Sequence, residues 1–124
     1  MAKKPTALTG AAGEHFVAYM LSAMGYPVAL TRGGSPTVDL MVGDLSGRSA
    51  VSVQVKTASW ARRPYKRKKE KNHWEWPVSK KARGLRGDLI YYAFVDLKWS
   101  DEAPPRPDVF VVPSATVADF LDRH

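Results

Sequence analysis

The sequence predicts a single α/β domain, a mixed central sheet flanked by an N-terminal and a C-terminal helix. Three observations predict this class. Apolar residues recur at helical spacing near both ends, runs of strand type fill the middle, and 124 residues without an internal repeat suit one domain spanning 1–124. With 44% hydrophobic and 25% charged residues, the composition supports a packed core and argues against a largely disordered basic tail.

The first elements follow from local patterns. Between residues 9 and 24, apolar residues recur three and four positions apart, which predicts an amphipathic helix that ends at Gly25-Tyr26-Pro27. Residues 27–31 have the composition of a short buried strand, and the glycines and proline of 32–36 predict a loop. Residues 37–42 and 49–57 are of strand type, and the turn residues between them predict a hairpin.

The second half alternates loops and strands. Seven of the ten residues from 62 to 71 are basic, which predicts a self-repelling loop, followed by a short edge strand at 74–78 and a helical turn at 79–83. The nearly continuous apolar run 89–97 predicts a central strand covered on both faces. A surface loop at 100–107, a strand at 109–112 and a closing helix that Pro113-Ser114 opens complete the expected fold.

Composition excludes several classes of protein. The chain has no cysteine, so a disulfide framework and a thiolate zinc site are impossible. His15, His73 and His124 lack ligand spacing and are expected to be exposed to solvent. No apolar run approaches a membrane span and no signal-peptide core is present, so we expect a cytoplasmic protein without a membrane partner. The net charge of +7 favours a polyanionic partner.

The predicted hairpin gathers polar side chains on one face. Side chains alternate along a strand, so Asp39, Gln54 and Lys56 should lie together on the face opposite the valines of both strands. A carboxylate, an amide oxygen and an ammonium would meet there. The hairpin alone is equally well explained as a two-sided hairpin with one solvated face.

The first helix adds a second carboxylate. Glu14 falls near Val17 and Leu21 at the border of the apolar face, whereas His15 points away from it. An exposed acid favoured by the positive N-terminus of the helix is the alternative. Glu14 and Asp39 together indicate a divalent-cation site, because Mg²⁺ is held by few carboxylates plus neutral oxygens and water.

The order of these residues resembles a known nuclease superfamily. The matching segments are Gly13-Glu14, Gly25-Tyr26-Pro27-Val28, Thr31-Arg32-Gly33-Gly34-Ser35, Thr37-Val38-Asp39-Leu40 and Val53-Gln54-Val55-Lys56-Thr57. A looser match continues through Phe94-Val95-Asp96-Leu97 and Phe110-Val111-Val112-Pro113-Ser114. This pattern resembles the PD-(D/E)XK, or restriction-endonuclease-like, superfamily. Within it, the pattern is closest to archaeal-type Holliday junction resolvases and small bacterial relatives.

The resemblance implies a metal-dependent endonuclease that hydrolyses DNA phosphodiester bonds, with a restriction-endonuclease-like core and a homodimeric assembly. Its cofactor would be Mg²⁺, with Mn²⁺ expected to substitute. The implied catalytic residues are Glu14, Asp39, Gln54, Lys56 and Ser35, and the implied metal ligands are Glu14, Asp39, Gln54 and the carbonyl of Val55. Two departures are evident. Proline does not immediately precede Asp39, and Gln54 replaces the usual acid, which removes one negative charge from the metal site.

The basic segments predict the nucleic-acid contacts, because lysine and arginine gain affinity by displacing condensed counterions. The basic loop at 60–73 and a second stretch supply the candidates, which are Arg32, Arg62, Arg63, Lys66, Arg67, Lys68, Lys69, Lys71, Lys80 and Lys81. Trp60, Tyr65 and Trp74 are candidates for stacking on unpaired bases, although core or interface packing is the stronger expectation for Trp74 and Trp76.

Two other functions stay open. The first is a catalytically degenerate nuclease fold that binds DNA or RNA through its basic surface, for which the missing acid at Gln54 is the main argument. The second is a basic RNA-binding or ribosome-associated protein in which the hairpin resemblance is accidental. An RNA-binding surface needs lysines, but it has no use for an inward-facing Glu14.

Overall fold

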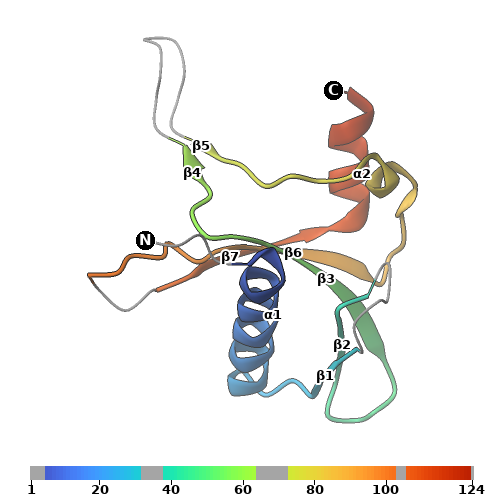
Figure 1. Ribbon diagram of the computed structural model, residues 1–124. Helices are drawn as coiled ribbons and strands as arrows, with labels where there is room; N and C mark the ends of the chain where they lie inside the picture. The colour runs from blue at the N-terminus through green and yellow to red at the C-terminus, as the bar shows by residue number, and fades with distance from the viewer. Residues whose placement is uncertain (1–4, 32–37, 64–72, 103–105, 124) are drawn as a thin grey trace.

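The computed structural model describes residues 5–31, 38–63, 73–102 and 106–123. Figure 1 shows a central sheet with α1 on one face and α2 with a short 3₁₀ helix on the other. The elements are α1 (Thr6–Ala23), β1 (Val28–Leu30), β2 (Leu40–Gly43), β3 (Ala50–Ala58), β4 (Arg62–Arg63), β5 (His73–Trp74), η1 (Lys80–Gly84), β6 (Ile90–Asp96), β7 (Asp108–Pro113) and α2 (Ser114–Arg123). The predicted α/β class and both flanking helices are confirmed.

The main sheet has five strands in the order β1-β2-β3-β6-β7. β3 and β6 run parallel, whereas the three other neighbouring pairs run antiparallel, so the predicted mixed sheet is confirmed. The predicted hairpin is the β2–β3 pair. In its turn, the carboxylate of Asp44 accepts hydrogen bonds from the hydroxyls of Ser46 and Ser49. This order places β3, the strand with most of the candidate site, in the middle of the sheet.

Helix α1 covers one face of the sheet through a small-residue and valine surface. Val17 and Ala18 are buried against Leu40, Val53 and further apolar residues of the strands. The helix begins at Thr6, earlier than predicted, because the carbonyl of Pro5 accepts the first helical N–H groups. That first turn is exposed and therefore shows no apolar periodicity. The helix ends as predicted, with Gly25 at φ +101°, a conformation that favours glycine.

Helix α2 and η1 cover the opposite face. Val117 of α2 and Ala82 of η1 are buried against Tyr92 of β6. The guanidinium of Arg86 donates to Asp119 at 2.6 Å and to Asp122 at 2.7 Å, so this cation holds the end of η1 to α2. A helical turn was predicted here and is confirmed. Among the helices of the described ranges, none combines the length and the apolar character that a membrane crossing requires.

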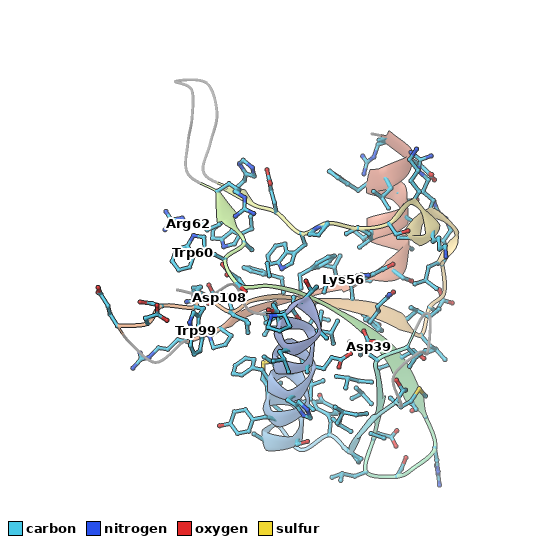
Figure 2. All side chains as sticks on the ribbon, in the orientation of Figure 1. Asp39, Lys56, Trp60, Arg62, Trp99 and Asp108 are labelled. Carbon is cyan, nitrogen blue, oxygen red and sulfur yellow. The ribbon has the colours of Figure 1, made fainter. Side chains whose placement is uncertain are left out.

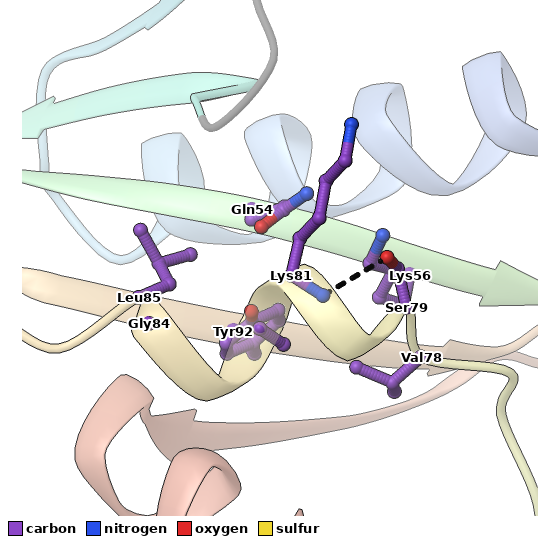
Figure 3. Close-up of a pocket in the computed structure, with 9 residues that line it drawn as sticks. Gln54, Lys56, Val78, Ser79, Lys81, Gly84, Leu85 and Tyr92 are labelled. Atoms are coloured by element: carbon purple, nitrogen blue, oxygen red, sulfur yellow. Dashed lines mark hydrogen bonds between the residues drawn. The ribbon is translucent and has the colours of Figure 1, made fainter.

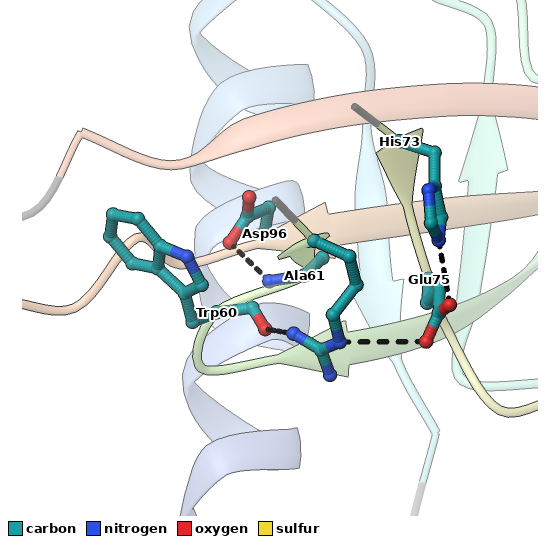
Figure 4. Close-up of polar contacts among 6 residues, drawn as sticks. Trp60, Ala61, His73, Glu75 and Asp96 are labelled. Carbon is teal, nitrogen blue, oxygen red and sulfur yellow. Dashed lines mark hydrogen bonds and ion pairs between the residues drawn. The ribbon is translucent and has the colours of Figure 1, made fainter. Parts of the chain in front are cut away.

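A two-stranded arm projects from the end of β3. β4 pairs antiparallel with β5, with Arg62 opposite Trp74. The buried carboxylate of Asp96 anchors the base of this arm by accepting the N–H of Ala61 at 3.0 Å (Figure 4). The edge strand predicted at 74–78 is therefore wrong beyond Trp74, and the short strand joins the arm instead of the main sheet, because its partner is the chain directly after β3.

Two further strand predictions have different outcomes. β6 is covered on both faces as predicted, with Ala93 and Val95 in the core under α1 and Tyr92 in the core under α2. By contrast, β1 is not a buried strand, since it lies at the edge of the sheet and Leu30 is 44% exposed. An apolar composition of three residues does not distinguish an edge strand from an internal one.

Candidate active site

The candidate site lies where β2 stops and β3 continues. β2 pairs with β3 between Ala50 and Val53, and among the described residues no strand pairs with the next residues of β3 on that side. Asp39, directly before β2, fills the gap. Its N–H donates to the carbonyl of Val53, and its carboxylate accepts the N–H of Val55 at 2.7 Å. Asp39 is therefore held against β3 on both sides of Gln54.

Helix α1 brings the second carboxylate to this point. The Glu14 side chain reaches the neighbourhood of the Asp39 carboxyl, which contributes to raising the pKa of Glu14. The preceding residue, Gly13, is buried where α1 lies closest to β3, and a Cβ there would meet the Thr57 side chain, with Oγ1 only 1.8 Å away. The absence of a side chain at Gly13 therefore lets the helix approach β3 closely enough for Glu14 to reach Asp39.

The contact between the two carboxylates changes the acidity of Glu14. Burial raises the pKa of Glu14 above its ordinary value, and the hydrogen bond and charge of Asp39 raise it further, against a smaller opposing effect of His15. Two carboxylates placed together without a cation repel each other. A divalent cation bound between them would offset this repulsion, and carboxylate oxygens are ligands that such cations prefer.

Gln54 and Lys56 line a pocket of about 550 Å³ on the side of the sheet that η1 covers (Figure 3). The other lining residues are Val78, Ser79, Lys81, Ala82, Gly84, Leu85 and Tyr92. Lys81 extends from η1 across Gln54, so two ammonium groups and an amide face one cavity. This donor set suits an anion such as a phosphate group.

The structure brings the four implied catalytic residues of the described ranges to neighbouring places as two pairs. Glu14 and Asp39 contact each other, and Gln54 and Lys56 share the pocket, but neither carboxylate is among the residues lining it. Figure 2 shows Asp39 and Lys56 at neighbouring positions along the central strands. The two pairs meet at Gln54, because Asp39 forms hydrogen bonds with Val53 and Val55, the residues on either side of Gln54.

The donor set fits a hard cation through two carboxylates and a neutral backbone oxygen. In the described ranges, no three histidine, cysteine, aspartate or glutamate residues come together. Two carboxylates are present, and the carbonyl of Val55 points to the same edge of β3 as the N–H that Asp39 accepts. Mg²⁺ is commonly held by one or two carboxylates with the remaining positions taken by water and substrate phosphate. Glu14, Asp39 and Val55 are therefore the residues that would hold it.

Several predicted residues have less direct roles. Arg62 is exposed on β4, while Arg63 donates to the carbonyl of Trp60 at 2.8 Å and pairs with Glu75 at 3.4 Å (Figure 4). Arg63 is thus engaged in holding the arm together. Lys80 is exposed on η1. Six predicted contact residues and the candidate serine lie outside the described residues, namely Arg32, Ser35, Lys66, Arg67, Lys68, Lys69 and Lys71.

Sequence reasoning missed the two other polar residues of the pocket, Ser79 and Tyr92. Tyr92 pairs in register with Gln54 across the parallel β3–β6 ladder, so its place on the Gln54 face depends on a strand pairing that local patterns do not reveal. Burial raises the pKa of Tyr92, which keeps its hydroxyl protonated. Ser79 caps η1 by accepting the N–H of Lys81. The strand alternation in 89–97 is the one signal that pointed to Tyr92.

Replacing Glu14 with glutamine should stabilise the protein in the absence of metal. The folded protein holds the proton of Glu14 more tightly than the unfolded chain, so stability falls as pH rises from the ordinary pKa of glutamate through the raised one. The destabilisation therefore grows over this pH interval and is absent below it. We therefore expect Glu14→Gln to raise the melting temperature by a few degrees at pH 7 in EDTA, and by less in acid.

The same variant tests the cation. Mg²⁺ should raise the melting temperature of the unmodified protein, because a ligand that binds only the folded state stabilises it, and should have no such effect on Glu14→Gln. Scanning calorimetry with and without EDTA measures both effects. A glutamine variant that melts lower than the unmodified protein in EDTA, or that keeps the full response to Mg²⁺, would contradict this account of the site.

Neither the sequence nor the structure identifies a family. No known family and no curated protein matches the sequence, and no solved structure matches the fold. The chemistry of this chain therefore has to be argued from its own residues.

Proposed function

We propose that this protein is a metal-dependent endodeoxyribonuclease of the PD-(D/E)XK type, in which Gln54 takes the place of the second acid. One observation carries the proposal. Asp39 contacts Glu14 and the backbone of Val55, and the next residue along β3, Lys56, lies in an adjacent cationic pocket. Carboxylates that can hold a metal, beside a pocket with ammonium groups, are the groups that metal-dependent phosphodiester hydrolysis uses.

Each residue of the site has a separate role in the proposed reaction. Glu14 and Asp39 would hold Mg²⁺, which supplies Lewis acidity and a more acidic water. Lys56 stabilises the negative charge that develops on the phosphoryl oxygens as the bond to the leaving oxygen breaks. The amide of Gln54, between the carboxylates and the pocket, orients the attacking water by hydrogen bonding. Because Gln54 is neutral, cation binding depends on the two acids.

DNA is the substrate that the charge of the chain favours. The net charge is +7, and Lys81 brings a second ammonium group to the pocket. Lys80 and Arg62, exposed on η1 and β4, would contact phosphates further along the strand. One site per chain cuts one strand, so symmetrical cleavage of both strands requires the homodimer that the resemblance implies.

A cleavage assay tests the proposal. Plasmid, branched and single-stranded DNA are incubated with the purified protein in Mg²⁺, Mn²⁺ or EDTA. We expect cleavage with either cation and none in EDTA or with Asp39→Asn, which keeps the shape of the side chain but loses its charge. Cleavage that survives in EDTA, or that Asp39→Asn leaves unchanged, would refute a site built on these carboxylates.

A nucleic-acid-binding module without catalytic activity is the second candidate. The neutral Gln54 favours it, together with the finding that only two acids meet at the site within the described segments. In that case the protein binds DNA or RNA through the same cationic surface, and no cation produces cleavage. Binding measured beside the cleavage assay separates the two functions.

A further inference from the structure

A second cavity lies beside the cationic pocket. It is a groove of about 530 Å³ whose wall is mainly aromatic and aliphatic. Its lining residues are Trp74, Trp76, Val78, Phe94, Phe110, Val112, Thr116, Val117, Phe120 and Leu121. The ring of Phe110 lies 6.0 Å from that of Trp74 and 5.8 Å from that of Trp76, between ring centroids. The proposed nuclease site does not use this groove.

The groove rings combine exposure with rigidity. Phe110 is 43% exposed and Trp74 is 45% exposed, so ring surface is open to a ligand. Trp76 is fixed from below, because its indole N–H donates to the carbonyl of Val95 at 2.8 Å and its ring packs on Phe94. An aromatic platform held in this way loses little conformational freedom when a flat ring stacks on it.

The groove adjoins the cationic pocket. Val78 lines both cavities, and the pocket also contains Lys56 and Lys81. Arg62 is the register partner of Trp74, a lining residue of the groove, in the β4–β5 arm. Cations therefore neighbour the aromatic surface, a pattern that suits a ligand with a flat ring and a phosphate chain.

We propose that this groove binds an unpaired nucleobase of the strand whose phosphate occupies the pocket of Lys56 and Lys81. The inference rests on the proposed function and specifies its substrate as nucleic acid with unpaired bases. In duplex DNA, both faces of a base are already stacked, so only a single strand, a flap or a branch point presents a free face. The lysines of the adjoining pocket distinguish this occupant from an apolar protein segment, which needs no neighbouring positive charge.

Substitutions at Phe110 test the proposal, because they separate the effect of the aromatic ring from the effect of side-chain size. Affinity is measured in EDTA, by fluorescence anisotropy, for a labelled oligothymidylate and for an abasic strand with the same number of phosphates. We expect Phe110→Leu to weaken oligothymidylate binding by about 5- to 150-fold, the range for loss of one base–aromatic stack, and to leave abasic-strand binding unchanged. Phe110→Tyr keeps an aromatic face and should retain the affinity.

The control is Trp99→Ala, which removes a comparably exposed ring, 41% exposed, that lies away from the pocket near Asp108 (Figure 2). It should bind both strands as the unmodified protein does. Equal losses on both strands, or no loss with Phe110→Leu, would overturn base binding in the groove. A change from dimer to monomer in Phe110→Leu, measured by sedimentation, would also overturn base binding. It would show that the groove is an interface between two copies of the chain. Binding is measured without metal. The binding result can therefore be interpreted even if the protein does not cleave DNA.

Discussion

Replacing Lys56 with alanine should lower the rate of metal-dependent DNA cleavage by about 10²- to 10³-fold, the loss expected when a group that stabilises developing charge is removed. Lys56 extends into the pocket from the middle of β3, and the rigid central strand holds it two residues from Gln54. Lys81 enters the same pocket from η1 and should not replace it, because that side chain approaches from the other wall. Single-turnover kinetics with saturating Mg²⁺ measure the effect on chemistry.

The matched control for this loss is Arg48→Ala. Arg48 is an exposed cation in the β2–β3 turn, at the opposite end of the hairpin from the candidate site, so its removal lowers the net charge by the same amount. We expect Arg48→Ala to keep the catalytic rate and to lose only a small fraction of DNA affinity, whereas Lys56→Ala loses catalytic rate, because of the two cations only Lys56 lines the pocket. If both variants cleave equally well, Lys56 takes no part in the reaction and the non-catalytic module becomes the better account.

The parts of the fold that the sequence predicted are those with strong local patterns. The β2–β3 hairpin could be predicted because turn residues separate two alternating strands, and that alternation also placed Asp39, Gln54 and Lys56 in one neighbourhood. Both flanking helices have apolar residues at helical spacing. These features depend on residues close in the chain, which is why a single sequence reveals them.

The missing features depend on residues far apart in the chain. The pocket forms because η1 folds over β3 and because β6 pairs with it in parallel, which brings Ser79 and Tyr92 beside Gln54. Nothing near those residues indicates that pairing. The same limit explains the arm, whose second strand was assigned to the main sheet. The contact of Glu14 with Asp39 also joins distant parts of the chain, because Glu14 comes from the helix on the other face of the sheet.

Replacing Gly13 with alanine should both destabilise the protein and remove its activity. The new methyl group would lie 1.8 Å from Oγ1 and 2.8 Å from Cβ of Thr57, and the hydroxyl of Thr57 is buried without a hydrogen-bond partner in the described structure. The helix must move away from β3 to relieve the overlap. Overpacking of this kind costs about 1–3 kcal/mol, which exceeds the roughly 0.5–1 kcal/mol that alanine gains over glycine within a helix.

Gly10 provides the matched control, one turn earlier in the same helix. A Cβ there meets nothing within 4 Å, so Gly10→Ala should stabilise the protein by about 0.5–1 kcal/mol in urea unfolding and leave cleavage unchanged. Any outward movement of α1 in Gly13→Ala separates Glu14 from Asp39, so the Mg²⁺-induced rise in melting temperature should be lost together with cleavage. An equal stabilisation by both alanines would show that α1 does not need this close approach.

A second change at Thr57 shows whether the contact itself is responsible. Thr57→Gly removes all three atoms that the alanine would overlap, so it should restore part of the stability of Gly13→Ala, although the same change alone weakens β3. A double-mutant cycle then gives a favourable coupling between the two positions. Recovery of the Mg²⁺ response in the double variant would tie the helix-to-strand distance to cation binding, because neither alanine at position 13 nor glycine at position 57 supplies a side-chain ligand. Additive losses would instead indicate that Gly13→Ala acts away from Thr57.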